Sequence, residues 1–127
     1  MKRFIPILLI LQSCIGAGDM FAKKENIVRE YYLVEGDDGN YDIGYNLGGS
    51  YIGRNPSNSN VVAYAIKDSL LAIKVLFYDS TVKYYVINMN RDRDIAKEEE
   101  YLVDTISGAN FRQSWLGKRN LMFKTVK

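Results

Sequence analysis

The chain has 127 residues, 47% of them hydrophobic and 25% charged, which is typical of one globular domain with an ordinary core. Histidine is absent and Cys14 is the only cysteine, which excludes zinc sites built from these ligands, a histidine general base and an intramolecular disulfide. The formal charge is +2, and without Lys2 and Arg3 fifteen basic residues face 15 acidic ones, so no basic surface for nucleic acid is expected.

Residues 1–11 begin with two basic residues and continue as a short apolar run, which is typical of a secretory signal. The run is too short to cross a bilayer comfortably, since a spanning helix takes about 20 apolar residues. The following Leu11-Gln12-Ser13-Cys14 resembles the lipobox of bacterial lipoproteins, although Gln12 departs from the small or aliphatic residue usual there. A lone thiol in an oxidising compartment is a liability unless it has a function, and lipidation would give it one.

These features predict a signal peptide over residues 1–13, a lipidated Cys14 with a flexible tether that ends at residue 26, and a single β-rich domain over residues 27–127. In the lipidated form the protein would be held on a bacterial membrane, because each buried CH₂ of an acyl chain contributes about 0.8 kcal/mol. The alternative is ordinary cleavage after Ala17 or Gly18, which would discard Cys14 and release a soluble protein.

The folded part is expected to begin with a strand over residues 27–35, where β-branched and aromatic residues dominate. After a turn, residues 41–47 alternate apolar and polar side chains, as a half-buried antiparallel strand does. A further short strand is expected over residues 50–54, before a polar loop at 55–60 in which Pro56 ends the pairing.

Residues 61–89 are the most regular stretch of the chain. Their β-branched and aromatic residues predict three strands in series, joined by polar turns at residues 67–69 and 79–81. In the second and third of these strands apolar residues occupy both faces, as in central strands that are covered on each side. We therefore expect these two strands to form the core.

The segment after the central block is charged with both signs over residues 90–100, which favours a solvated loop or a short exposed helix. Strand character returns over residues 101–106 and again over residues 121–126. Between them, residues 109–118 suit a short helix, because three of its residues would share one apolar face: Phe111, Trp115 and Leu116.

The sum of these elements is a mainly β protein, α+β at most. It predicts a small antiparallel β-barrel or sandwich of about six to eight strands, with one short helix near the C-terminus.

No stretch carries recognisable catalytic or metal-binding chemistry. Asp38, Asn40 and Asp42 alternate as at the start of a calcium loop, but Ile43 and Gly49 stand where such a loop needs glycine and glutamate. The acidic run at 98–100 is flanked by basic residues, as solvated faces usually are, and serine has no histidine partner. The sequence therefore predicts no enzyme, no cofactor and no metal.

The ten tyrosines are the most unusual feature of the composition. Tyrosines such as Tyr45 and Tyr51 on the surface of a rigid sheet would offer contact area to an envelope protein or a glycan. The alternative is that they serve core and cross-strand packing, which tyrosine also does well.

As a whole the chain resembles the small uncharacterised lipoproteins of bacteria, which have a short signal, a lipobox cysteine and a compact β domain. The resemblance is carried by residues 11–14, 45–49, 51–54 and 84–87. It implies an exported, lipid-anchored protein of the cell envelope. Since no activity is assigned to such families, a non-catalytic binding or structural role is expected.

A second resemblance implies an alternative function. The sequence Ser-Gly-Ala-Asn-Phe at residues 107–111 resembles the Ser-Gly-Ala-x-Tyr loop of membrane-bound lysozyme inhibitors. Phe111 replaces the tyrosine of that loop, and the disulfide often found in that family cannot form here. On this resemblance the protein would be an inhibitor or immunity protein against an envelope-attacking enzyme, which Ser107, Gly108 and Phe111 would contact.

Overall fold

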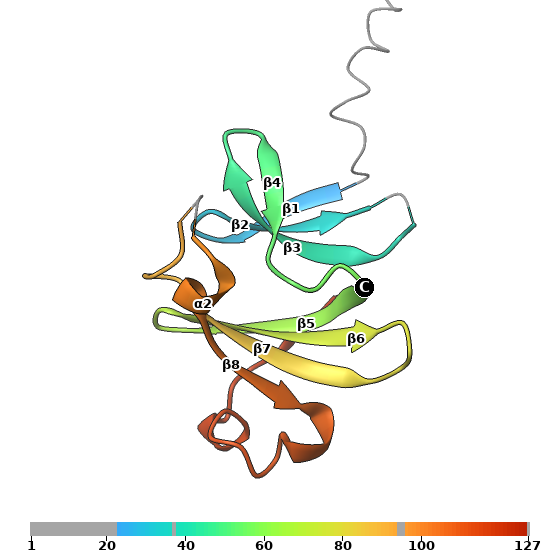
Figure 1. The fold of residues 1–127 in the computed structure, drawn as a ribbon, viewed down its shortest axis with the longest axis vertical. Helices are drawn as coiled ribbons and strands as arrows, with labels where there is room; N and C mark the ends of the chain where they lie inside the picture. Colours follow the sequence, from blue (N-terminus) through green and yellow to red (C-terminus); the bar gives the residue numbers. More distant parts are fainter. Residues whose placement is uncertain (1–22, 37, 94–95, 127) are drawn as a thin grey trace, which may run out of the picture.

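The computed structural model describes residues 23–36, 38–93 and 96–126, which form two antiparallel β-sheets packed face to face (Figure 1). The first sheet has four strands and the second has five. The predicted mainly β fold is confirmed. Of the two architectures left open, the structure is sandwich-like and not a closed barrel, with nine strands in the described residues.

The first sheet is a meander of four strands: β1 (Lys23–Val28), β2 (Tyr31–Glu35), β3 (Tyr41–Leu47) and β4 (Ser50–Gly53). The single first strand expected over residues 27–35 is wrong, because the chain reverses at Arg29, whose φ is 50°. The side chain of Asn26 holds this turn by donating to the carbonyl oxygens of Arg29 and Tyr31, at 2.8 and 3.1 Å. Strand pairing also begins at Lys23, four residues before the expected start of the domain.

The second sheet contains the regular block of the sequence as three consecutive hairpin strands: β5 (Ser59–Lys67), β6 (Leu70–Phe77) and β7 (Val82–Asn88). Their turns fall where polar residues predict them, with Asp68 and Ser80 at φ values of 55° and 76°. The sheet is completed by β8 (Leu102–Ser107) beside β7 and by β9 (Lys124–Thr125) beside β5.

The main core lies between the two sheets. Inward-facing residues of both sheets are fully buried there, among them Ile43 of β3, Ile73 of β6 and Ile87 of β7. The opposite face of β6 and β7 is also covered, with Ala72 and Val86 almost without exposed surface. The expectation of two central strands buried on both faces is therefore confirmed.

The outer face of the second sheet is covered by the segment that follows β8, residues 108–123, which lies below that sheet in Figure 1. We call this segment the C-terminal cap. Its buried anchor is Leu116, which is 1% exposed, and half-buried phenylalanines at positions 111 and 123 pack around it. The cap therefore buries the outer hydrophobic face of the second sheet.

The α-helix expected over residues 109–118 does not form. The cap instead contains two 3-10 turns, η2 (Gly108–Asn110) and η3 (Gly117–Arg119). Between them the hydroxyl of Ser114 donates to the carbonyl oxygen of Phe111 and accepts from the N–H of Gly117, so a side chain replaces helical backbone bonds. The short helix is α2 (Glu98–Tyr101), in the charged segment where a loop or a helix was expected.

None of the helices in the described ranges is long and apolar enough to span a membrane.

Candidate functional site

The residues singled out from sequence do not form one site. Cys14 lies outside the described residues. Ser107, Gly108 and Phe111 lie at the end of β8 and in the cap on the second sheet, whereas Tyr45 and Tyr51 belong to the first sheet.

The Ser107–Phe111 loop is largely built into the fold. Gly108 lies against the backbone and side chain of Val82, where a Cβ would come within 3.0 Å of the Val82 carbonyl oxygen. The Phe111 ring stacks on Tyr84 with ring centroids 4.0 Å apart and also contacts the edge of Phe123. Phe111 therefore holds the cap on the sheet, and the exposed part of the loop is Ala109 and Asn110.

Beside this loop lies an open groove of about 710 Å³. Ser107 and Gly108 form one wall, and Lys74 and Lys83 lie along the groove from the neighbouring strands. The two ammonium groups lie 5.9 Å from the ring centroid of Tyr84 and 5.6 Å from that of Phe77, respectively. The inhibitor role implied for this loop stays a prediction.

Tyr45 and Tyr51 lie on opposite faces of the first sheet. Tyr45 packs edge-on against the buried Tyr31, with ring centroids 5.5 Å apart. Tyr51 packs against Tyr32 on the outer face, with centroids 5.3 Å apart, and the ammonium group of Lys24 lies 5.8 Å from its ring centroid. Tyr45 thus serves the interior, and Tyr51 belongs to a small aromatic patch on the outside.

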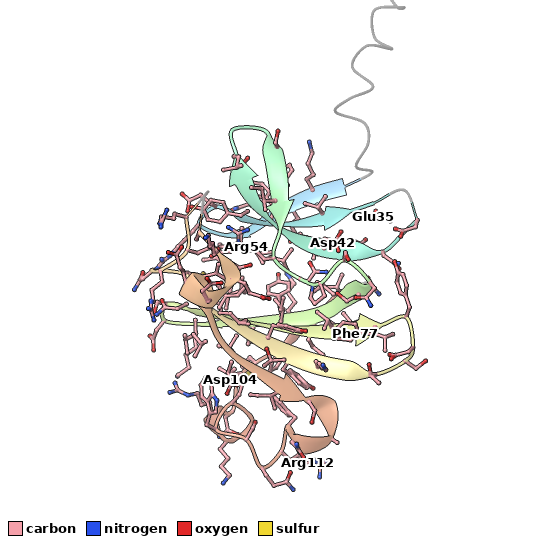
Figure 2. The ribbon with its side chains drawn as sticks, in the orientation of Figure 1. Glu35, Asp42, Arg54, Phe77, Asp104 and Arg112 are labelled. Carbon is pink, nitrogen blue, oxygen red and sulfur yellow. The ribbon has the colours of Figure 1, made fainter. Side chains whose placement is uncertain are left out.

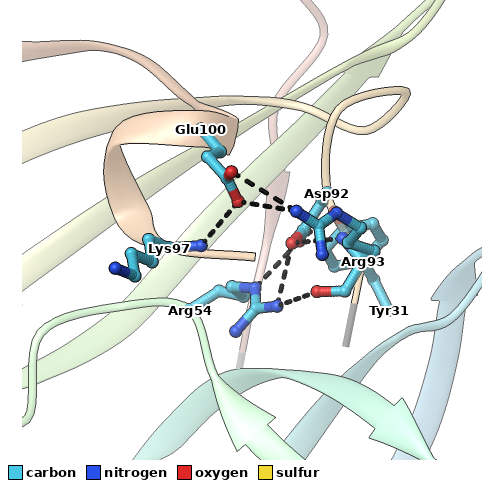
Figure 3. A network of polar contacts seen from close by, with 6 residues as sticks. All are labelled: Tyr31, Arg54, Asp92, Arg93, Lys97 and Glu100. Atoms are coloured by element: carbon cyan, nitrogen blue, oxygen red, sulfur yellow. Dashed lines mark hydrogen bonds and ion pairs between the residues drawn. The ribbon is translucent and has the colours of Figure 1, made fainter. Parts of the chain in front are cut away.

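A buried cluster of hydrogen-bonded polar side chains was not predicted from the sequence. The guanidinium of Arg54, just after β4, forms two parallel hydrogen bonds of 2.8 Å with the carboxylate of Asp92 (Figure 3). The hydroxyl of Tyr31 donates to the same carboxylate at 2.5 Å. Arg54 lies beside α2, between the sheets (Figure 2), and both charged side chains are buried. We call Tyr31, Arg54 and Asp92 the polar clasp.

Aromatic rings complete the surroundings of the buried guanidinium. The guanidinium carbon of Arg54 lies 5.0 Å from the ring centroid of Tyr45 and 4.6 Å from that of Tyr101 in α2. Stacking on ring faces suits the flat, weakly hydrated guanidinium and makes its burial easier. The clasp therefore joins strands of the first sheet to the connection between β7 and α2.

The carboxylate of Asp92 is fully occupied. It accepts four hydrogen bonds, one from Tyr31, two from Arg54 and one from the backbone N–H of Arg93, and an ionised carboxylate has about four lone-pair positions. No acceptor position is left for a substrate or a metal ion. The geometry gives the clasp a structural role and not a catalytic one.

Burial changes the acid–base behaviour of the clasp. Burial raises the pKa of Tyr31 strongly, and the hydrogen bond to Asp92 and the negative charge of its carboxylate raise it further. Burial alone would lower the pKa of Arg54, but the hydrogen bond and charge of Asp92 outweigh it, so the pKa of Arg54 is raised. The folded clasp therefore consists of a neutral Tyr31 phenol beside the Arg54–Asp92 ion pair.

A stability loss in alkali follows from the raised pKa of Tyr31. The unfolded phenol ionises near pH 10, whereas the folded one keeps its proton, so Tyr31's contribution is complete below about pH 10 and falls as the pH rises further. We expect Tyr31→Phe to reduce the slope of unfolding free energy against pH above about pH 10, measured by urea unfolding at several pH values. An identical slope in the variant and the original chain would contradict this assignment.

A metal site is not suggested by the described residues. Among them, no group of three or more Asp, Glu, His or Cys side chains is arranged to hold a metal ion. In three hollows lined by described residues the carboxylates are separate, since Glu25, Asp79 and Asp42 each line a different one.

The signal that could have revealed the clasp is not local. Arg54 and Asp92 are 38 positions apart, and Asp92 stands in a mixed-charge run that resembles a solvated face.

Comparison with protein-family models, with curated proteins and with solved structures gave no significant match.

Proposed function

We propose that the protein is a lipid-anchored lipoprotein of the bacterial cell envelope with a non-catalytic binding role. The observation that carries the proposal is the position of Cys14 between a secretory-type apolar run and the start of the folded domain at Lys23. The nine residue steps between them span at most about 30 Å of extended chain. A lipid on Cys14 would therefore hold the sandwich close to a membrane, with β1 nearest to it along the chain.

The described site chemistry supports a binding role over catalysis. A hydrolytic pair of carboxylates needs two acids that share a cleft, one of them with a raised pKa. Here the buried acid, Asp92, is saturated by its own structural partners, and Glu25 and Asp79 are each the single acid of the described hollow that they line. A β-sandwich with side-chain-lined hollows suits the recognition of an envelope component.

Membrane fractionation tests the anchor. We expect the original chain, expressed in a bacterial host, to stay with the membrane pellet after a high-salt wash, whereas Cys14→Ala moves to the soluble fraction or remains as an uncleaved precursor. Ser13→Ala is the matched control, because it keeps a small residue before the cysteine and should still be anchored. A soluble original chain, or a mature Cys14→Ala chain that stays in the pellet, would refute the lipid anchor.

A further inference from the structure

A cleft of about 360 Å³ opens between the two sheets, a volume in the range of small-molecule sites. Its walls are Leu33 of β2 and Tyr41 of β3 on one side, and Tyr64 of β5 and Val126 on the other. These walls are mainly apolar and aromatic. The cleft is distinct from the groove beside Ser107 and from the polar clasp.

Two opposite charges line the cleft, one from each sheet. Glu25 of β1 pairs with Leu33, and Lys124 of β9 pairs with Tyr64, so each charged side chain projects on the same face as a core residue. Both Glu25 and Lys124 are exposed. In the described part of the chain neither of them takes part in an ion pair or a side-chain hydrogen bond.

A tyrosine of low exposure, Tyr64, also lines the cleft. Tyr64 is only 7% exposed, yet its hydroxyl has no hydrogen-bond partner among residues 23–36, 38–93 and 96–126. Buried tyrosine hydroxyls usually find a partner, and those that lack one within the protein require water or a ligand. The cleft therefore combines apolar walls with one unoccupied hydrogen-bonding group and two unpaired charges.

We propose that this cleft binds a small zwitterionic amphiphile. Its apolar body lies between Leu33 and Val126, its ammonium group meets Glu25, its acidic group meets Lys124, and the Tyr64 hydroxyl bonds one of its polar atoms. Two sources share this chemistry: a free hydrophobic amino acid, and a single-chain lipid with a phosphoethanolamine headgroup. The inference deepens the binding role proposed above and rests on it.

Calorimetric titration of the Cys14→Ala protein purified from the soluble fraction tests the site, since this form carries no lipid and needs no detergent. The probes are L-phenylalanine and lysophosphatidylethanolamine below its micellar concentration. We expect saturable 1:1 binding of at least one of them, and which one binds identifies the source. Phenethylamine and 3-phenylpropionate, which each lack one of the two charges of phenylalanine, should bind at least about tenfold more weakly where the amino acid is the ligand.

Substitutions in the cleft locate the binding. Glu25→Gln and Lys124→Met should each raise the Kd about tenfold, and Tyr64→Phe should raise it severalfold while keeping the ring. Lys67→Met is the matched control, because Lys67 is an exposed lysine at the end of β5 that is not part of the cleft wall, and it should leave the Kd unchanged. Backbone amide shifts at residues 25, 64 and 124 during titration give a readout that needs no cleft variant.

The proposal is overturned if neither probe binds saturably, or if the Kd is unaffected by the Glu25 and Lys124 substitutions. In that event the inward charges serve only to keep the edge strands β1 and β9 from pairing with other chains. Such a failure leaves the lipid anchor standing, because the anchor is tested by fractionation of the chain with Cys14 intact.

Discussion

Asp92→Ala is expected to lower the free energy of unfolding by about 3–5 kcal/mol, the cost of leaving a buried charge without its partner. The substitution removes all four hydrogen bonds of the carboxylate and leaves the Arg54 guanidinium, 7% exposed as a residue, beside only aromatic rings and one backbone carbonyl. Urea unfolding followed by circular dichroism measures the change. Loss of the clasp should also loosen the connection between β7 and α2, where Asp92 lies.

The control for this prediction is the exposed ion pair of the same region. Arg93 and Glu100 lie 3.3 Å apart, with side chains 52% and 42% exposed, and Glu100 also accepts from the backbone N–H of Lys97 at the start of α2, so Glu100→Ala should cost only about 1 kcal/mol. The double variant Arg54→Leu/Asp92→Leu should be less destabilised than the sum of its single variants, because it leaves no unpaired charge. Equal losses for Asp92→Ala and Glu100→Ala would contradict the structural importance of the clasp.

Leu116→Ala is expected to lower the free energy of unfolding by about 2–5 kcal/mol, the usual cost of truncating a buried leucine. Leu116 is 1% exposed and packs against the outer face of the second sheet with Ala72, Val86 and Ile106. Because the cap has no regular helix of its own, this side chain is its main buried anchor. Its truncation should therefore release the cap and expose the apolar face beneath it.

Leu76→Ala is the matched control, since it removes the same atoms from a leucine that is 38% exposed on β6. It should cost much less than the Leu116 substitution. Binding of a hydrophobic dye should rise for Leu116→Ala and not for Leu76→Ala. Equal destabilisation by the two substitutions would mean that the cap does not stabilise the second sheet.

The strands could be predicted because their signals are local. Apolar alternation and polar turns at 67–69 and 79–81 locate β5, β6 and β7, and apolar residues on both faces predict that β6 and β7 are central. The reversal at Arg29 was not predicted because the turn between β1 and β2 consists of Arg29 and Glu30, which are not typical turn residues such as Gly, Pro, Asn or Asp. The side chain that fixes it, Asn26, lies inside the strand before.

The cap and the clasp could not be predicted because they depend on distant partners. The spacing of Phe111, Trp115 and Leu116 favours a helix, but Ser114 bonds the local backbone and Phe111 finds a stacking partner in Tyr84. The clasp joins three strand or loop ends that are far apart in sequence, and its charges resemble ordinary surface charges. The inter-sheet cleft likewise depends on the register that brings Glu25 and Lys124 to the inner face.

The measurement that tests the central claim most directly is the intact mass of the protein extracted from membranes, beside the same measurement on Cys14→Ala. The account predicts a mature chain that begins at Cys14 and carries the added mass of its acyl chains, and it predicts that this mass is absent from the variant. An unacylated chain that begins near Gly18 or Asp19 would contradict the lipid anchor and make the sandwich a free secreted domain.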